Sequence, residues 1–158
     1  MGMRQRSRSI GLSAAVAVLL LAGCADPDPA GPSAQPGQTG APPGQAGPEA
    51  FQVTAITENG QPRPPVGETG IVLTIDGGTI TVAAGCNDMS GRVSVDGQRL
   101  AVSDLISTDM FCGEELGEQE IWLSAFLAEG PGWQRTGGEL VLRTAGAELR
   151  LTAHDRPS

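Results

Sequence analysis

The sequence has no lysine, no tyrosine and one histidine, and only 3% of its residues are aromatic. All ten basic residues are arginines, and 18 acidic residues bring the formal net charge to −8 at pH 7. Phosphate backbones would repel such a chain, and charge alone would not hold it on anionic lipid. These shortages exclude nucleic acid as a partner and leave imidazole chemistry to His154 alone.

A long apolar run is also missing, because no stretch reaches the roughly 20 residues that a membrane-spanning helix needs. The first nine residues carry three arginines and no acidic group, and residues 10–21 are apolar or small. A basic start followed by a short apolar run is typical of a secretory signal. Residues 1–23 are therefore predicted to be a signal peptide, with a short membrane anchor as the alternative.

The residues from Leu21 to Cys24 read Leu-Ala-Gly-Cys and resemble the bacterial lipobox. In that motif a diacylglycerol is attached to the cysteine and the chain is cut just before it. Stable anchoring needs two or more acyl chains such as palmitate. We expect Cys24 to be lipidated and the protein to be exported and anchored to the outer face of the cell membrane of a bacterial envelope. Ordinary signal cleavage beside an unrelated cysteine is the alternative.

Residues 24–50 are expected to form the lipidated cysteine and a linker. From residue 25 onward this stretch is rich in proline, glycine and alanine, and it has no large apolar side chain. Such a segment cannot bury enough surface to offset its chain entropy. We expect a disordered spacer that lifts a domain off the membrane. Loss of the three leader arginines would change the formal charge from −8 to −11.

Residues 51–154 have the pattern of one folded domain, followed by a short tail at 155–158. Apolar and polar residues alternate along most of it, which is typical of strands with one buried face. Phe51–Ile56 is a predicted first strand, and turn residues at 76–78, 96–97 and 145–146 predict three hairpins. Residues 57–70 are expected to be looser. The pattern favours an antiparallel β-meander.

One segment, about 113–129, follows a helical period instead. Leu116, Glu120, Leu123 and Leu127 fall on one stripe, and Trp122 and Phe126 lie beside it. Acidic residues crowd the first turns, where the helix dipole favours them, and residues 130–132 end the helix. The fold class is therefore predicted to be α+β, with one helix laid on an open face of the sheet.

Two motifs in this domain resemble the META (HslJ-like) domain of bacterial envelope proteins. The first is Gly85-Cys86-Asn87-Asp88-Met89-Ser90-Gly91, and the second runs from Thr108 to Cys112, with Glu118-Gln119-Glu120 behind it. Phe51 stands where the family usually has tryptophan, and Asp109 where it usually has a basic residue. The resemblance implies a half-open barrel closed by a helix, similar to lipoproteins that hold apolar groups, and it implies no reaction, catalytic residue or cofactor.

Cys86 and Cys112 remain as a pair once Cys24 is assigned to lipid. In an exported protein an even pair is most simply a disulfide. Free buried thiols, a metal site with His154 and a catalytic thiol are the alternatives. A zinc site needs four ligands and a catalytic thiol needs a positioned base, so no metal site is expected. The two methionines beside these cysteines, Met89 and Met110, are expected to fill gaps in the core.

The remaining candidate residues predict binding rather than catalysis. Asn87 and Gly91 are expected to serve a turn, together with Gly85 and Ser90, through side-chain capping and a positive φ. Trp122 and Phe126 are candidates for an apolar groove. No nucleophile elbow is present, and the acidic helix start is expected to be a solvated first turn rather than a catalytic carboxylate pair.

These observations predict a monomeric, non-enzymatic envelope lipoprotein. Its domain would bind an apolar ligand or a protein partner in envelope maintenance or stress tolerance. The alternatives are an extracytoplasmic enzyme inhibitor, with residues 87–90 as its exposed loop, and a hydrolase, which would show a cleft of convergent polar groups.

Overall fold

A computed structural model describes residues 40–68 and 70–155, which form one compact unit. The predicted signal peptide, Cys24 and most of the predicted linker lie outside these residues. The elements in chain order are β1 (Glu49–Glu58), β2 (Gln61–Pro62), β3 (Val72–Asp76), β4 (Thr79–Ala83), β5 (Asp88–Asp96), β6 (Arg99–Ser107), α1 (Glu114–Ala128), β7 (Gly132–Thr136), β8 (Glu139–Arg143) and β9 (Ala147–Ala153). Within the described residues, no helix is both long enough and apolar enough to cross a membrane.

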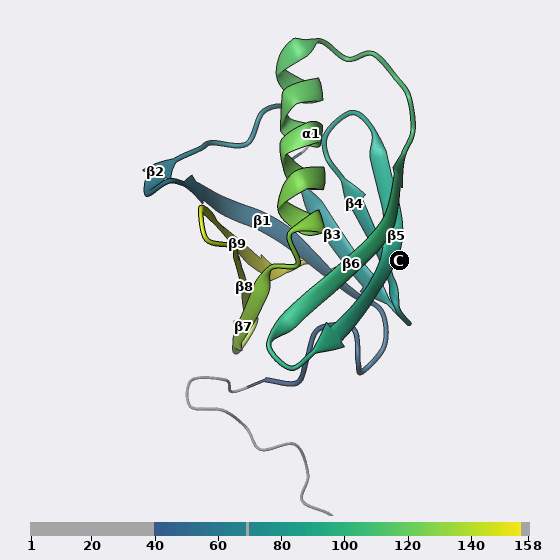
Figure 1. The fold of residues 1–158 in the computed structure, drawn as a ribbon, viewed down its shortest axis with the longest axis vertical. Coiled ribbons are helices and arrows are strands. Elements are labelled where there is room, and N and C mark those ends of the chain that lie inside the picture. The colour runs from purple at the N-terminus through teal and green to yellow at the C-terminus, as the bar shows by residue number, and fades with distance from the viewer. Residues whose placement is uncertain (1–39, 69, 156–158) are drawn as a thin grey trace, which may run out of the picture. The chain divides into compact units, whose positions relative to one another are not determined.

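The strands form one antiparallel sheet that closes on itself. Neighbours run in the order β2-β1-β3-β4-β5-β6-β7-β8-β9, and β1 also pairs with β9, from Phe51↔Ala153 to Glu58↔Ala147. The expectation of antiparallel β structure with one helix is confirmed, but the ring is complete rather than half-open. Its weakest seam lies between β6 and β7, which share a single residue pair, Arg99↔Gly132. Figure 1 shows α1 standing beside β6, with the β6–α1 loop arching over to the start of the helix.

Alternating side chains from every long strand fill the barrel. In β4 the inward Ile80 and Val82 are buried and their neighbours are exposed, as the period-two pattern requires. β8 departs from this pattern, because Val141 is buried together with Leu140 and Leu142. The twelve largest fully buried side chains are Phe51, Ile71, Leu73, Ile80, Met89, Leu100, Leu123, Leu127, Leu140, Leu142, Leu149 and Leu151. The interior is thus packed with the protein's own side chains.

The helix occupies the range that the sequence predicts, with Gly113 as its N-cap and Glu129 as its C-cap. Leu123, Phe126 and Leu127 are buried and join the barrel core. The buried stripe also includes Gln119, whereas Glu120 is only half-buried. The buried face of the helix is therefore rotated about the helix axis by a few tens of degrees (roughly half a residue step) from the stripe that the apolar spacing predicts.

Two strands lack a clear sequence signal. β2 pairs with the end of β1 through the turn at Asn59 and Gly60, whose φ angles of 51° and 77° are those of a tight hairpin. β7 buries only Trp133 and is otherwise polar, so its sequence shows no apolar alternation. Both strands are positioned by their partners rather than by their own composition.

Candidate functional site

The loop between β6 and α1 is tied to the turn after β4 by a disulfide. The sulfur atoms of Cys86 and Cys112 lie at bonding distance, and the two Cα atoms are 6.0 Å apart. Cys86 is half-buried, and Cys112 is exposed at the start of the helix. The bond joins two segments that are 26 residues apart in sequence, as the reasoning from the cysteine count predicts.

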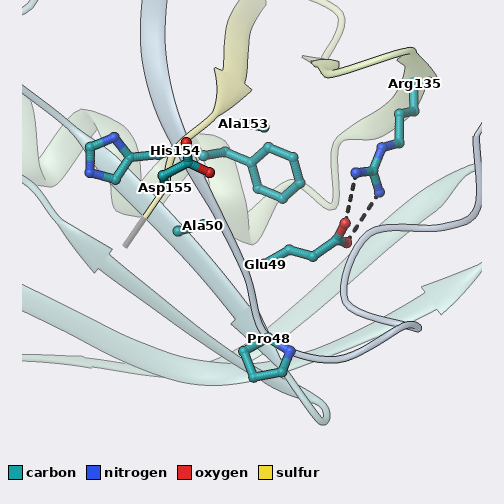
Figure 2. Close-up of a pocket in the computed structure, with 8 residues that line it drawn as sticks. Pro48, Glu49, Ala50, Arg135, Ala153, His154 and Asp155 are labelled. Atoms are coloured by element: carbon teal, nitrogen blue, oxygen red, sulfur yellow. Dashed lines mark hydrogen bonds and ion pairs between the residues drawn. The ribbon is translucent and has the colours of Figure 1, made fainter. Parts of the chain in front are cut away.

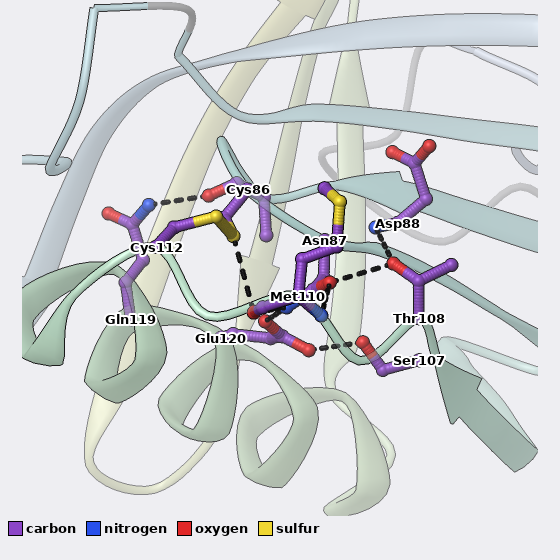
Figure 3. The surroundings of a disulfide bond; sticks show 10 residues. Cys86, Asn87, Asp88, Ser107, Thr108, Met110, Cys112, Gln119 and Glu120 are labelled. Atoms are coloured by element: carbon purple, nitrogen blue, oxygen red, sulfur yellow. Dashed lines mark hydrogen bonds between the residues drawn. A yellow bond between two sulfur atoms is a disulfide. The ribbon is translucent and has the colours of Figure 1, made fainter.

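Asn87 holds the same loop through its side-chain amide (Figure 3). Its side-chain oxygen accepts hydrogen bonds from Met110 N and from Thr108 Oγ1, both at 2.8 Å. Its Nδ2 donates to Met110 O at 3.1 Å and to Glu120 Oε2 at 2.8 Å. Asn87 is 7% exposed, so its amide is almost fully occupied by these contacts. It caps the β6–α1 loop, which is distant in sequence, rather than its own turn.

Two polar side chains of α1 complete this arrangement. Glu120 accepts a hydrogen bond from Ser107 Oγ as well as from Asn87, so its carboxylate joins β6, the β4–β5 turn and the helix. Gln119 donates to Ala84 O at 2.8 Å and accepts from Val66 N at 2.6 Å. Sequence reasoning names Gln119 only as part of a motif and gives it no role, although a polar residue in line with Leu123 and Leu127 is a signal for such a bridge.

An exposed apolar surface lies next to this loop. We call it the apolar face; in the described part of the chain it contains all the large apolar side chains that remain exposed: Ile106 (72%), Met110 (59%), Phe111 (91%) and Ile121 (72%). A hollow of about 360 Å³ separates Ile106 from Ile121, and a second of about 410 Å³ contains Met110, Phe111 and Ile121. Met89 fills the core as expected, but Met110 does not: the Asn87 contacts hold its backbone at the surface, and the side chain faces solvent.

Carboxylates line the apolar face, with Glu120 at the first hollow and Glu114 and Glu118 at the second. The chain has no basic residue between Arg99 and Arg135. Over that stretch it has seven acidic ones: Asp104, Asp109, Glu114, Glu115, Glu118, Glu120 and Glu129. Asp104 pairs with Arg92 at 3.6 Å, at the edge of this region. Within residues 40–68 and 70–155, no ion pair involves Asp109, Glu114, Glu115 or Glu118.

Trp122 and Phe126, the predicted groove residues, stack with ring centroids 5.5 Å apart. Phe126 is buried, and the Arg63 guanidinium carbon lies over the Trp122 ring, 4.8 Å from the ring centroid. Trp122 Nε1 donates to Glu58 at 2.7 Å; this bond, followed by the ion pair with Arg63, lowers the pKa of Glu58. A small hollow of about 190 Å³ lies beside the pair, with a polar rim. Ligand binding here remains a prediction.

Among the described residues, the most buried ion pair joins β7 to the start of β1. Arg135 Nη2 contacts Glu49 Oε1 at 2.7 Å, and the guanidinium lies 5.5 Å from the Phe51 ring centroid. The hydrogen bond from Arg135 is the main cause of the lowered pKa of Glu49. Both residues of this pair and His154 line a hollow of about 300 Å³, and Figure 2 shows how these side chains lie. The cysteines are not among its lining residues, which is evidence against the His154–cysteine metal site.

The glycines of the first motif serve different purposes. Gly85 has a φ of 101°, a conformation that favours glycine, and it makes the turn after β4. The expected positive φ at Gly91 is wrong, because Gly91 lies within β5. A Cβ there would approach Ser103 O to 2.8 Å, where β6 bulges at Asp104. Ser90 pairs with Ile106 in the same sheet.

The residues proposed for an inhibitor loop are not exposed as a loop. Asn87 is buried, and Asp88 begins β5. The rigid exposed loop is instead 108–112, on the other side of the disulfide. Among the described residues, no group of three or more His, Cys, Asp or Glu side chains could hold a metal ion.

These features define a closed antiparallel barrel with one covering helix and a disulfide-braced loop. Residues 47–156 match the META domain family, so the chain belongs to that family, as the two motifs predict. Among solved structures, an NMR structure of a protein from Burkholderia xenovorans is similar at a TM-score of 0.59 and 21% identity, over 68% of this chain and 83% of that one. A second NMR structure has a TM-score of 0.53 and 24% identity, over 66% and 87%. These likenesses show the fold. No curated protein matches the chain.

Proposed function

We propose that this protein is a non-enzymatic envelope lipoprotein, anchored by lipid on Cys24, whose META domain binds a partner outside the cell membrane. Residues 25–50 would act as the spacer between the anchor and the domain. In this role the domain supports envelope maintenance or stress tolerance by binding rather than by turning over a substrate.

The observation that carries the proposal is the apolar face. Exposed apolar side chains are common singly, but a group of large ones beside two hollows is typical of an interaction site. The packed barrel interior favours binding at this outer surface over binding inside the barrel. The lipobox supports the membrane anchor, and the acidic charge of the chain supports a partner other than nucleic acid.

The test compares the full chain with Cys24→Ser in cells of a bacterium that processes lipoproteins. We expect the full chain to fractionate with membranes and its N-terminal peptide to carry diacylglycerol by mass spectrometry. Cys24→Ser should be exported but released. A Cys24→Ser chain that remains on the membrane, or a Cys24 peptide without lipid, would contradict the anchor. Crosslinking in intact cells should recover a neighbour bound at Phe111; recovery of neither protein nor lipid would contradict the binding role.

A further inference from the structure

We propose that the apolar face is a docking surface for a cationic amphipathic segment of a partner protein. The segment would place apolar side chains in the two hollows beside Ile121 and its basic side chains against the surrounding carboxylates. This inference rests on the proposed function only in taking the domain to be a binding module, and it does not depend on the lipid anchor.

The first argument is the rigidity of the loop that displays Met110 and Phe111. The disulfide at Cys112 holds one end of this loop, and Asn87 binds both the N–H and the carbonyl of Met110. Yet the Phe111 side chain is 91% exposed and contributes almost no buried area to the fold. A loop held in place by folding loses little further entropy when a partner binds, so its apolar side chains are available for docking at low cost.

The second argument is the shape of the surface. Ile121 projects from α1 between the hollows of about 360 and 410 Å³. Both volumes fall within the range of about 300–1,000 Å³ that is usual for binding sites. Two adjacent hollows on one side of a helix suit a segment with apolar side chains at successive turns, which is how amphipathic helices bind to grooves.

The third argument is charge, which selects the occupant. Glu114 and Glu118 line the second hollow, and the exposed Asp109 and Glu115 are their near neighbours in sequence. None of the four forms an ion pair in the described residues. The helix dipole stabilises the first-turn carboxylates, but their negative charge still faces solvent. A cationic partner would gain attraction here, and steering by this field would raise its rate of association.

The same charge argues against the other occupants. In a dimer formed through this face, the acidic borders of two copies would meet, and like charges across an interface disfavour binding. An anionic membrane surface, or a free fatty acid with its carboxylate, would be repelled in the same way. A basic and apolar peptide segment therefore fits the observations best.

The experiment uses the exported chain carrying Cys24→Ser and a labelled probe peptide. The probe is an amphipathic helix of about five turns with leucine on one face and arginine on the other, and the control peptide has glutamate in place of arginine. Fluorescence anisotropy should show saturable binding of the arginine peptide that weakens as salt is raised, and at least ~10-fold weaker binding of the glutamate peptide.

Variants identify the surface. Phe111→Ser should weaken binding at least ~10-fold, whereas Phe111→Leu, which stays apolar, should remain within about threefold. The triple change Glu114→Gln, Glu115→Gln and Glu118→Gln should weaken binding and flatten its salt dependence. The matched control Asp76→Asn, an exposed carboxylate at the β3–β4 turn, should bind as the parent does. Circular dichroism confirms that each variant is folded.

Several results would overturn the inference: no saturable binding of the arginine peptide, equal binding of both peptides, or binding by Phe111→Ser equal to that of the parent. Self-association through the face in sedimentation, or binding of the lipid-free chain to anionic vesicles that Phe111→Ser abolishes, would assign the surface to another occupant. None of these results affects the Cys24 fractionation test. Conversely, a failed anchor would leave the peptide-binding result unchanged.

Discussion

Replacing Asn87 with aspartate tests the hydrogen-bond network that braces the β6–α1 loop. The substitution keeps the shape of the side chain and the oxygen that accepts from Met110 N and Thr108 Oγ1. It replaces the Nδ2 donor, which serves Met110 O and Glu120 Oε2, by a second carboxylate oxygen. That oxygen would then face a carboxylate at the 2.8 Å now spanned by a hydrogen bond.

The loss of stability follows from these contacts. The bond to Met110 O contributes about 1 kcal/mol, and a hydrogen bond to a charged group such as Glu120 about 1.5–3 kcal/mol. Repulsion between the two carboxylates adds to this, so Asn87→Asp should lower the free energy of unfolding by about 3–5 kcal/mol at pH 7. The unfavourable neighbour raises the folded-state pKa of the introduced carboxyl above its unfolded value of about 4. The deficit is therefore largest at neutral pH and shrinks as the pH falls, because the introduced carboxyl then binds a proton and can donate again.

Urea denaturation of the exported Cys24→Ser chain, with and without Asn87→Asp, measures this difference at pH 7 and at about pH 4.5. Asn87→Ala provides the control, because it removes the contacts without adding a charge and should be destabilised nearly equally at both pH values. A loss below about 1 kcal/mol at pH 7 would refute the reasoning. An equal loss for Asn87→Asp at both pH values would show that the amide does not donate toward Glu120.

Three further outcomes can be measured on the same background. Gly91→Ala should destabilise the domain by about 1–3 kcal/mol, because its Cβ would lie 2.8 Å from Ser103 O. Gly117→Ala, in open space on the helix, should instead stabilise the domain by about 0.5–1 kcal/mol. A change of the same sign for both variants in urea denaturation would contradict the bulge geometry. Thiol titration of the exported protein should give no signal until the protein is unfolded and reduced, and free thiols in the native protein would exclude the disulfide. The double variant Cys86→Ser and Cys112→Ser, which lacks this crosslink between residues 26 apart, should have a free energy of unfolding lower by about 3–4 kcal/mol. The lowered pKa of Glu49 means that its ion pair with Arg135 stabilises the fold above about pH 4.5, and that this stabilisation is lost as the pH falls through the folded-state pKa. Glu49→Gln should therefore flatten the acid side of the stability–pH curve more than Glu139→Gln, which removes an exposed ion pair. Identical curves for the two variants would argue against the Glu49–Arg135 pair.

The sequence predicts what depends on local pattern. The hairpins at 71–83 and 140–151 follow from apolar residues at every second position on both sides of a turn, although Val141 is buried as well. The helix follows from its apolar stripe and its glycine-rich end. Closure of the ring was not predictable in this way, because the pairing of β1 with β9 joins segments about a hundred residues apart. Nothing in the composition of either strand specifies that partner.

The candidate site shows the same division. The Cys86–Cys112 pair follows from counting cysteines, since the reasoning needs no geometry. The Asn87 network could not be predicted, because Asn87, Thr108 and Glu120 come from three separate segments that meet only in the folded chain. Apolar residues such as Met110 and Phe111 are expected in the core by default. Only the bracing of their loop shows that folding leaves them at the surface.

The single residue pair between β6 and β7 makes the covering helix part of the barrel's closure. The chain crosses this seam through α1, which packs along β6 before β7 begins. Transient separation of the two strands should therefore be the first way in which the native state opens, and amide hydrogens around Gly132 should exchange faster than those between β8 and β9. A segment bound across Ile106 and Ile121 would clamp β6 to α1 and slow that exchange, although it would not touch β7. Binding at the outer surface would then stabilise the β6–β7 seam of the barrel against local opening.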